Sequence, residues 1–102
     1  MKRFAIQYRL EVGTPEVWHQ EIARFIAALD ADPEIAGRIS YRCMKIGAGP
    51  AYVHLVAAED DIPNLLQTRP WFKHYTEETR RISGGKVEVT PIEIVGQTQK
   101  LM

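Results

Sequence analysis

His54 is the residue of this chain best suited to chemistry, because it stands in the middle of an otherwise apolar run, Ala51 to Ala58. Histidine alone has an unperturbed pKa near neutrality, so in a pocket it can hydrogen-bond a ligand or transfer a proton. The alternative is a core histidine whose ring is satisfied by one backbone or tyrosine partner. Both interpretations stay open, and His54 is the candidate catalytic residue.

Aromatic side chains are the candidates for contacts with a substrate. Tyr8 lies in the first apolar segment, and we expect it to hydrogen-bond a substrate if it faces the same pocket as His54. Simple packing, with the hydroxyl at a rim, is the alternative. Three later residues are candidates for apolar walls: Trp71, Phe72 and Tyr75. Together these residues favour a small apolar or aromatic ligand.

The other reactive side chains do not combine into a site. The three histidines His19, His54 and His74 lack the spacing of metal ligands, so we expect no metal. His74 falls outside the apolar stripe of its predicted helix and should lie at the surface. Cys43 has no catalytic partner nearby and is expected to be a small buried hydrophobe. Residues 47–50 are glycine-rich but precede no helix, so no phosphate loop forms and we expect no cofactor.

Composition excludes several classes of partner. The 13 Lys and Arg residues balance 13 Asp and Glu residues, and a net charge of zero leaves no footprint for nucleic acid or an anionic membrane. A single cysteine permits no internal disulfide, which fits a reducing compartment. Polar residues interrupt the first apolar run, so we expect no signal peptide, and no stretch approaches membrane-spanning length. We therefore expect a cytoplasmic protein with one domain over residues 1–102.

The segments that position these residues begin with a strand, a helix and a hairpin. Alternating apolar residues predict a strand over residues 4–12. Thr14, followed by proline, is typical of a helix start, and the apolar stripe from Trp18 to Leu29 continues that helix. Two further strands are predicted over residues 38–46 and 51–58, and the tight link between them makes the pair a hairpin.

The remainder of the chain predicts a helix and a strand. Acidic residues 59–61 start a helical segment that Pro70 should kink or restart, because proline removes a donor and clashes with the preceding turn. Gly84 and Gly85 should end it. The last strand is predicted over residues 86–96. Its apolar residues change face at Thr90-Pro91, which indicates a bulge or a sheet edge.

Two β-α-β units joined by a hairpin predict an α+β, ferredoxin-like fold of the order β-α-β-β-α-β. Such a fold has a four-stranded antiparallel sheet with both helices on one face. The second and third strands are apolar on both faces, so the uncovered face also needs a cover. A second copy of the sheet is the simplest cover. We therefore expect a homodimer, a dimeric α/β barrel to which the last strand contributes.

Four segments carry a resemblance to a known family. They are the opening strand with Arg9-Leu10, the run Tyr52–Val56, the stretch Pro70–Lys73 and the tail Val87–Ile92. In this order they resemble the antibiotic-biosynthesis-monooxygenase-like group of dimeric α/β barrels across nearly the whole chain. The resemblance implies the fold. For function it implies a cofactor-independent monooxygenase acting on an electron-rich aromatic compound, with a dry pocket and a base supplied by the protein.

The family's site residues differ at most matching positions. Its haem-degrading branch uses an asparagine, a tryptophan and an axial histidine where this chain has Tyr8, Leu66 and Thr76, so we expect no specific haem binding. In the branch that oxidises polycyclic phenols to quinones, an asparagine stands where this chain has His54, which is also polar; the other two positions differ. The alternative function is a non-catalytic dimerisation or ligand-sensing module in which His54 is structural.

Overall fold

The computed structural model describes residues 1–99 and confirms the expected order of elements. The first half contains strand β1 (Lys2–Arg9), helix α1 (Pro15–Ala31) and strand β2 (Ile39–Lys45). The second half contains strand β3 (Ala51–Ala58), helices α2 (Ile62–Leu66) and α3 (Pro70–Ile82), and strand β4 (Glu88–Pro91). This is the α+β, ferredoxin-like arrangement that the sequence predicts.

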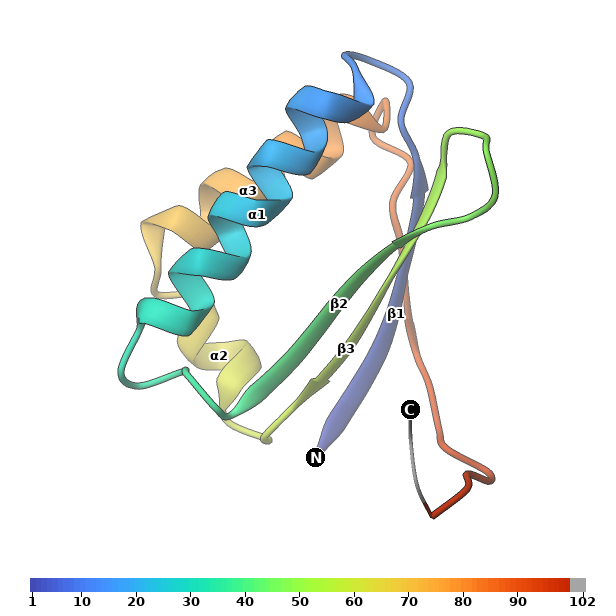
Figure 1. Cartoon of the computed structure of the whole chain (residues 1–102). Helices are drawn as coiled ribbons and strands as arrows, with labels where there is room; N and C mark the ends of the chain where they lie inside the picture. Colours follow the sequence, from blue (N-terminus) through green and yellow to red (C-terminus); the bar gives the residue numbers. More distant parts are fainter. Residues whose placement is uncertain (100–102) are drawn as a thin grey trace.

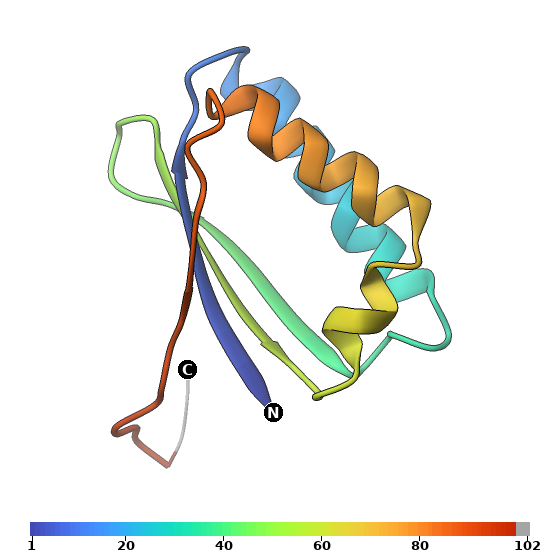
Figure 2. The same cartoon turned by 180° about the vertical axis from the view of Figure 1, so that it is seen from behind.

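The four strands form one antiparallel sheet in the order β2-β3-β1-β4. The helices cover one face of this sheet, with α1 and α3 side by side along it (Figures 1 and 2). No helix of the described chain covers the opposite face. The fold is therefore a two-layer structure with one face of its sheet open.

Local sequence rules account for the helix starts. The backbone of Thr14 is extended, and its Oγ1 accepts a hydrogen bond from the Val17 N–H at 3.4 Å, while Pro15 occupies the first helical position. Pro70 begins α3 after the short α2, which confirms that this proline restarts the helix. The residues that α1 buries are Trp18, Phe25 and Leu29.

Strand β4 is shorter than predicted. It covers Glu88–Pro91, so the expectation of a strand up to residue 96 is wrong. The Ile92 N–H still donates to the Arg3 carbonyl at 3.1 Å. Because β1 begins only one residue before Arg3, β4 finds almost no further residues of β1 to pair with. Pairing with β1 is continuous and β4 is the outermost strand, so a sheet edge, not a bulge, explains Thr90-Pro91. The following segment projects beyond the sheet (Figures 1 and 2).

Strand β1 also ends earlier than the predicted residue 12. After Arg9 the chain leaves the sheet. The N–H groups of Glu11 and Val12 both donate to the Ile82 carbonyl at the end of α3, at 2.7 and 3.1 Å. These bonds hold the end of α3 beside the end of β1, where the chain enters the first helix.

The two faces of the sheet differ in composition. The helix-covered face carries the core side chains of the three long strands, among them Phe4, Ile6, Tyr8, Tyr41, Tyr52, His54 and Val56. The open face carries apolar and basic side chains together, among them Arg3, Ala5, Arg9, Arg42, Met44, Val53 and Leu55. The expectation that both faces are apolar therefore holds only in part.

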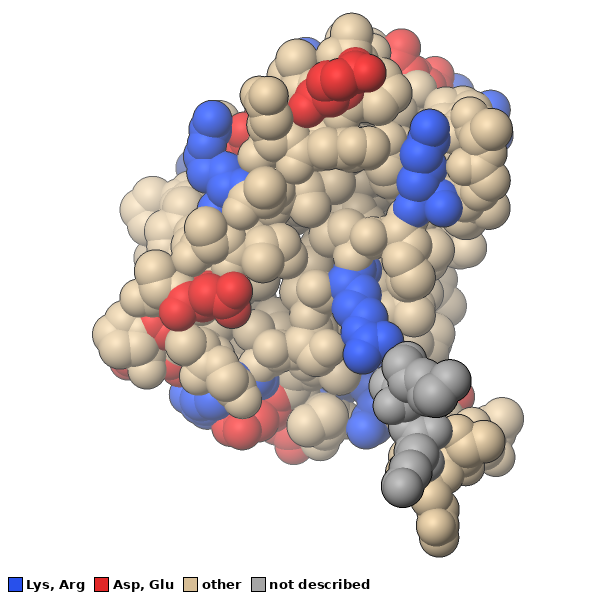
Figure 3. All heavy atoms as spheres, in the orientation of Figure 1, with Lys and Arg blue, Asp and Glu red and all other residues tan. Residues whose placement is uncertain are grey.

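Charges are dispersed over the surface. Acidic and basic side chains are interspersed on the side of the molecule that Figure 3 displays, without a patch of one sign. Within residues 1–99, no helix is both long enough and apolar enough to span a membrane.

Candidate functional site

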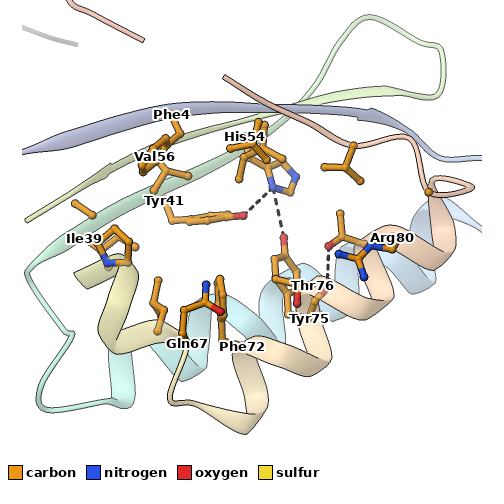
Figure 4. A pocket seen from close by; sticks show the side chains of 18 residues that line it. Phe4, Ile39, Tyr41, His54, Val56, Gln67, Phe72, Tyr75, Thr76 and Arg80 are labelled. Atoms are coloured by element: carbon orange, nitrogen blue, oxygen red, sulfur yellow. Dashed lines mark hydrogen bonds between the residues drawn. The ribbon is translucent and has the colours of Figure 1, made fainter. Parts of the chain in front are cut away.

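A cavity of about 440 Å³ lies between the sheet and helices α2 and α3. All four strands and both of these helices contribute to its lining, which is mostly apolar. The apolar walls include Phe4, Ile39, Val56, Leu66, Phe72 and Val87 (Figure 4). Its size and apolar character are typical of small-molecule pockets.

His54 occupies the polar inner end of this cavity. Its side chain, 0% exposed, lies on the helix-covered face between Ile6 of β1 and Cys43 of β2. Burial removes the hydration that a charged imidazolium needs, and this lowers the pKa of His54 from 6.5 to about 4. The ring is therefore neutral at pH 7.

Three tyrosine hydroxyls surround the His54 ring. The Tyr8 Oη lies 2.7 Å from Nε2, while the Oη atoms of Tyr41 and Tyr75 lie 3.1 and 3.4 Å from Nδ1. Figure 4 shows Tyr41 from β2 and Tyr75 from α3 converging on the ring. Burial raises the pKa of all three phenols well above the ordinary value of 10. The cluster is thus neutral.

The hydrogen-bonded cluster continues into helix α1. The Trp18 Nε1–H donates to the Tyr8 Oη at 2.7 Å. Rings pack along the same path: Tyr8 meets Trp18 edge-on with ring centroids 5.9 Å apart, and Trp18 stacks on Tyr75 at 5.8 Å. Three strands and two helices therefore fix the position of one imidazole.

The structure brings only some of the expected ligand contacts to the cavity. Phe72 and Tyr75 line it. Tyr8 does not; it bonds to the His54 nitrogen that faces away from Tyr41 and Tyr75. Trp71 lies outside the lining and packs against Phe25, with ring centroids 5.9 Å apart. Adjacent helical residues point in directions about 100° apart, so Phe72 reaches the cavity while the neighbouring Trp71 does not.

Two members of the cluster, Tyr41 and Trp18, were not predicted from the sequence as site residues. Tyr41 was expected only as one of the apolar residues on the second strand, and Trp18 only as part of the apolar stripe of α1. A buried indole N–H needs an acceptor, which was a signal that Trp18 has a polar partner. For Tyr41 the sequence holds no such signal, because its place beside His54 follows from the pairing of Cys43 with His54, which the structure shows.

The remaining reactive side chains lie apart from the cavity or are unreactive. His19 is exposed and bonds to the Tyr52 hydroxyl at 2.8 Å. His74 is exposed as expected, 3.3 Å from a Glu21 oxygen. Burial raises the pKa of the half-buried Cys43 to about 12, so it remains a thiol. No group of three or more His, Cys, Asp or Glu residues is placed to hold a metal ion within residues 1–99.

Comparison with known proteins supports the architecture. No family model and no curated protein matches the chain. Among solved structures, the chain resembles a mutant of SnoaB, a cofactor-independent oxygenase from Streptomyces nogalater, with a TM-score of 0.75 and 17% sequence identity over 97% of each chain. At this identity the likeness concerns the fold. It confirms the fold resemblance to the antibiotic-biosynthesis-monooxygenase-like group.

Proposed function

We propose that this chain binds an apolar small molecule between its sheet and helices and oxidises it as a cofactor-independent monooxygenase. The observation that carries the proposal is the cavity of about 440 Å³, with apolar walls and one buried polar cluster at its inner end. Pockets of this form bury most of a small ligand and orient it through a few polar groups. The fold likeness to a cofactor-independent oxygenase supports the activity.

The proposed substrate is an electron-rich aromatic compound such as a phenol. One dioxygen molecule converts a phenol into a quinone and one water: one oxygen atom enters the ring, and the other leaves with two hydrogens from the substrate. The substrate supplies all the electrons, so no reduced cofactor is consumed. The chain contributes a dry cavity, and His54 with its tyrosines is proposed to anchor the ring that reacts.

A ligand-binding module without catalysis is the second candidate function. Both ring nitrogens of His54 already contact tyrosine hydroxyls, which is the arrangement a structural histidine requires. In this alternative the cavity binds its ligand and releases it unchanged. Binding is common to both candidates, and consumption of dioxygen separates them.

We also propose that the chain acts as a homodimer. Leu55 and Met44 are 38% and 37% exposed on the open face of the sheet, and Ile92 and Ile94 are 39% and 48% exposed beyond β4. Apolar side chains gathered on one uncovered face mark an interaction surface. A second copy of the same sheet covers that face in both subunits at once.

Matched variants at neighbouring positions of α3 test the proposed binding site. Phe72→Ala removes a ring from the cavity wall and should weaken the binding of a naphthol probe about tenfold, through lost packing. Trp71→Ala removes a ring outside the lining and should leave the probe's dissociation constant unchanged. Titration calorimetry measures both. Equal affinity of the parent and both variants would place the probe elsewhere and contradict the proposal.

An oxygen electrode separates the two candidate functions. Metal-free protein saturated with a naphthol should consume one dioxygen for each quinone formed, and a catalase control excludes free peroxide. Binding without oxygen consumption over a panel of phenols supports the non-catalytic candidate.

A further inference from the structure

The indole of Trp18 determines which group donates and which accepts in the hydrogen bonds around His54. An indole N–H can only donate, so the Tyr8 oxygen is the acceptor in its 2.7 Å contact with Trp18. The Tyr8 hydroxyl therefore donates its own hydrogen to Nε2 of His54, at 2.7 Å. A hydrogen on Nε2 would leave the buried Tyr8 O–H with no acceptor, which burial makes unfavourable. His54 therefore carries its hydrogen on Nδ1.

The Nδ1–H group points to the cavity side of the cluster. Its acceptors there are the hydroxyls of Tyr41, at 3.1 Å, and Tyr75, at 3.4 Å. Both tyrosines line the cavity, and Tyr41 is the less buried of the two. The Tyr41 oxygen is the nearer of the two acceptors of the Nδ1–H, so the hydrogen of the Tyr41 hydroxyl itself remains free.

The hydroxyl hydrogens of Tyr41 and Tyr75 are not used within the cluster. Three hydrogen bonds take up the hydrogens of Trp18, Tyr8 and His54. Since the tryptophan end can only donate, the unused hydrogens lie at the cavity end. Tyr75 is buried, so the less buried Tyr41 is the better placed of the two to donate to a ligand.

No other inner side chain of the described lining competes as a donor. The hydroxyls of Thr76 and Thr79 donate to backbone carbonyls of their own helix, at 2.9 and 2.8 Å. Gln67 and Arg80 are exposed, so they lie toward the solvent side of the lining. The inner end of the cavity therefore offers only the hydroxyls of Tyr41 and Tyr75 as hydrogen-bond donors, and no charge.

We propose that Tyr41 is the specificity-determining residue, and that its hydroxyl donates to a ketone, quinone or phenol oxygen on an otherwise apolar, uncharged ligand. This inference rests on the proposed binding function and adds the chemical class of the ligand to it. The Nδ1–H of His54 acts through Tyr41, so His54 is a positioning residue and does not take a proton from the ligand. Trp18 determines the donor and acceptor roles along the series of hydrogen bonds from its indole to Tyr41.

The tautomer of His54 tests the direction without any ligand. Nitrogen-15 NMR of the parent protein at neutral pH should show a protonated Nδ1 and a bare Nε2, with the signal assigned by its loss in His54→Gln. A neutral ring protonated on Nε2 would overturn the inference. Since this measurement uses the unmodified protein, it does not depend on whether a variant folds.

Two probes of the same skeleton test the ligand class. Tyr41→Phe should weaken the binding of α-tetralone, a ketone, about 3- to 10-fold, the range for one neutral hydrogen bond, and leave the binding of tetralin unchanged. Comparing variants cancels the different hydration of the two probes. Tyr75→Phe is the matched control: it removes a hydroxyl of the same cluster but leaves Tyr41 its free hydrogen, so the affinity for α-tetralone should stay near that of the parent.

The possible outcomes distinguish a failure of the role assigned to Tyr41 from a failure of the proposed binding function. Equal effects of Tyr41→Phe on both probes, or a larger ketone effect in Tyr75→Phe, would overturn the assignment while the cavity still binds. If neither probe binds the parent, the proposed binding function fails, and the ligand class fails with it. The carbonyl stretch of bound α-tetralone should lie at lower frequency in the parent than in Tyr41→Phe.

Discussion

His54 has no opposite charge among its contacts, because the groups that reach its ring are phenol hydroxyls. Neutral partners do not compensate a buried imidazolium for its lost hydration, and the pKa falls to about 4 as a result. A neutral histidine has one donor and one acceptor nitrogen, and the tyrosines on its two sides match that polarity. At the scale of single residues, the site is therefore built for polar contact without charge.

We predict that His54 gives the protein an acid-sensitive component of stability. Its pKa is about 4 in the folded state and near 6.5 in the unfolded state, so the unfolded state binds the extra proton first as the pH falls. This component is fully present above about pH 6.5 and is lost as the pH falls toward 4. Its loss lowers the free energy of unfolding by about 3 kcal/mol. Denaturant titrations of the parent and His54→Gln between these values measure it.

His74→Gln is the matched control for that comparison. The His74 side chain is 60% exposed, so its removal should leave the parent's pH profile almost unchanged. The carboxylates that pair with Arg38 and Arg69 are the same in all three proteins, and their contributions cancel. A stability profile of His54→Gln parallel to that of the parent would contradict a buried neutral ring.

Sequence analysis identified His54 but could not identify its partners. The structural interpretation of His54 gave it one backbone or tyrosine partner, whereas three tyrosines contact the ring. Whether the Tyr41 hydroxyl contacts His54 depends on the register of β2 against β3. Whether the Tyr75 hydroxyl does so depends on how closely α3 approaches the sheet. A pattern of apolar residues fixes which face a residue occupies but not these distances.

At the scale of elements, the turn from α3 into β4 depends on two successive glycines with positive φ, Gly84 at +65° and Gly85 at +81°. We predict that Gly85→Ala lowers the free energy of unfolding by about 1–2 kcal/mol, because a β-carbon disfavours left-handed backbone. Nothing lies within 4 Å of the added β-carbon, so the cost is backbone strain and not a clash. Thermal and denaturant unfolding measure it.

Gly49→Ala provides the reference for that strain. Gly49 has equally open surroundings but no positive φ, so its replacement should cost less than that of Gly85. Equal losses of stability at the two positions would show that positive φ is not what the α3–β4 turn requires.

The order of elements was predictable because local rules act at most boundaries. Thr14 caps α1, Pro70 restarts the helix as α3, and Gly84-Gly85 ends it. The end of β4 was not predictable in this way. It depends on where β1 begins, and residues 86–96 carry no information about a strand at the other end of the chain.

At the scale of the whole molecule, we predict that the full chain sediments as a dimer at micromolar concentration. Leu55→Glu places a charge on the open face of the sheet and should produce monomers. Val17→Glu places the same charge at a 63% exposed position of α1, on the opposite layer, and should leave the dimer intact. A well-folded, monomeric parent chain at this concentration would contradict the barrel.

The central position of β1 has a consequence for the order in which the protein can fold. β1 leaves the ribosome before the other strands of this sheet, yet Ile6 pairs with His54 of β3 and with Val89 of β4, the last of the four strands. The hairpin of β2 and β3 closes over a short loop, whereas both pairings of β1 close long ones, which form more slowly. The nascent chain therefore holds β1 unpaired until its partners are synthesised. The wall that encloses the cavity on the β4 side is the last to form.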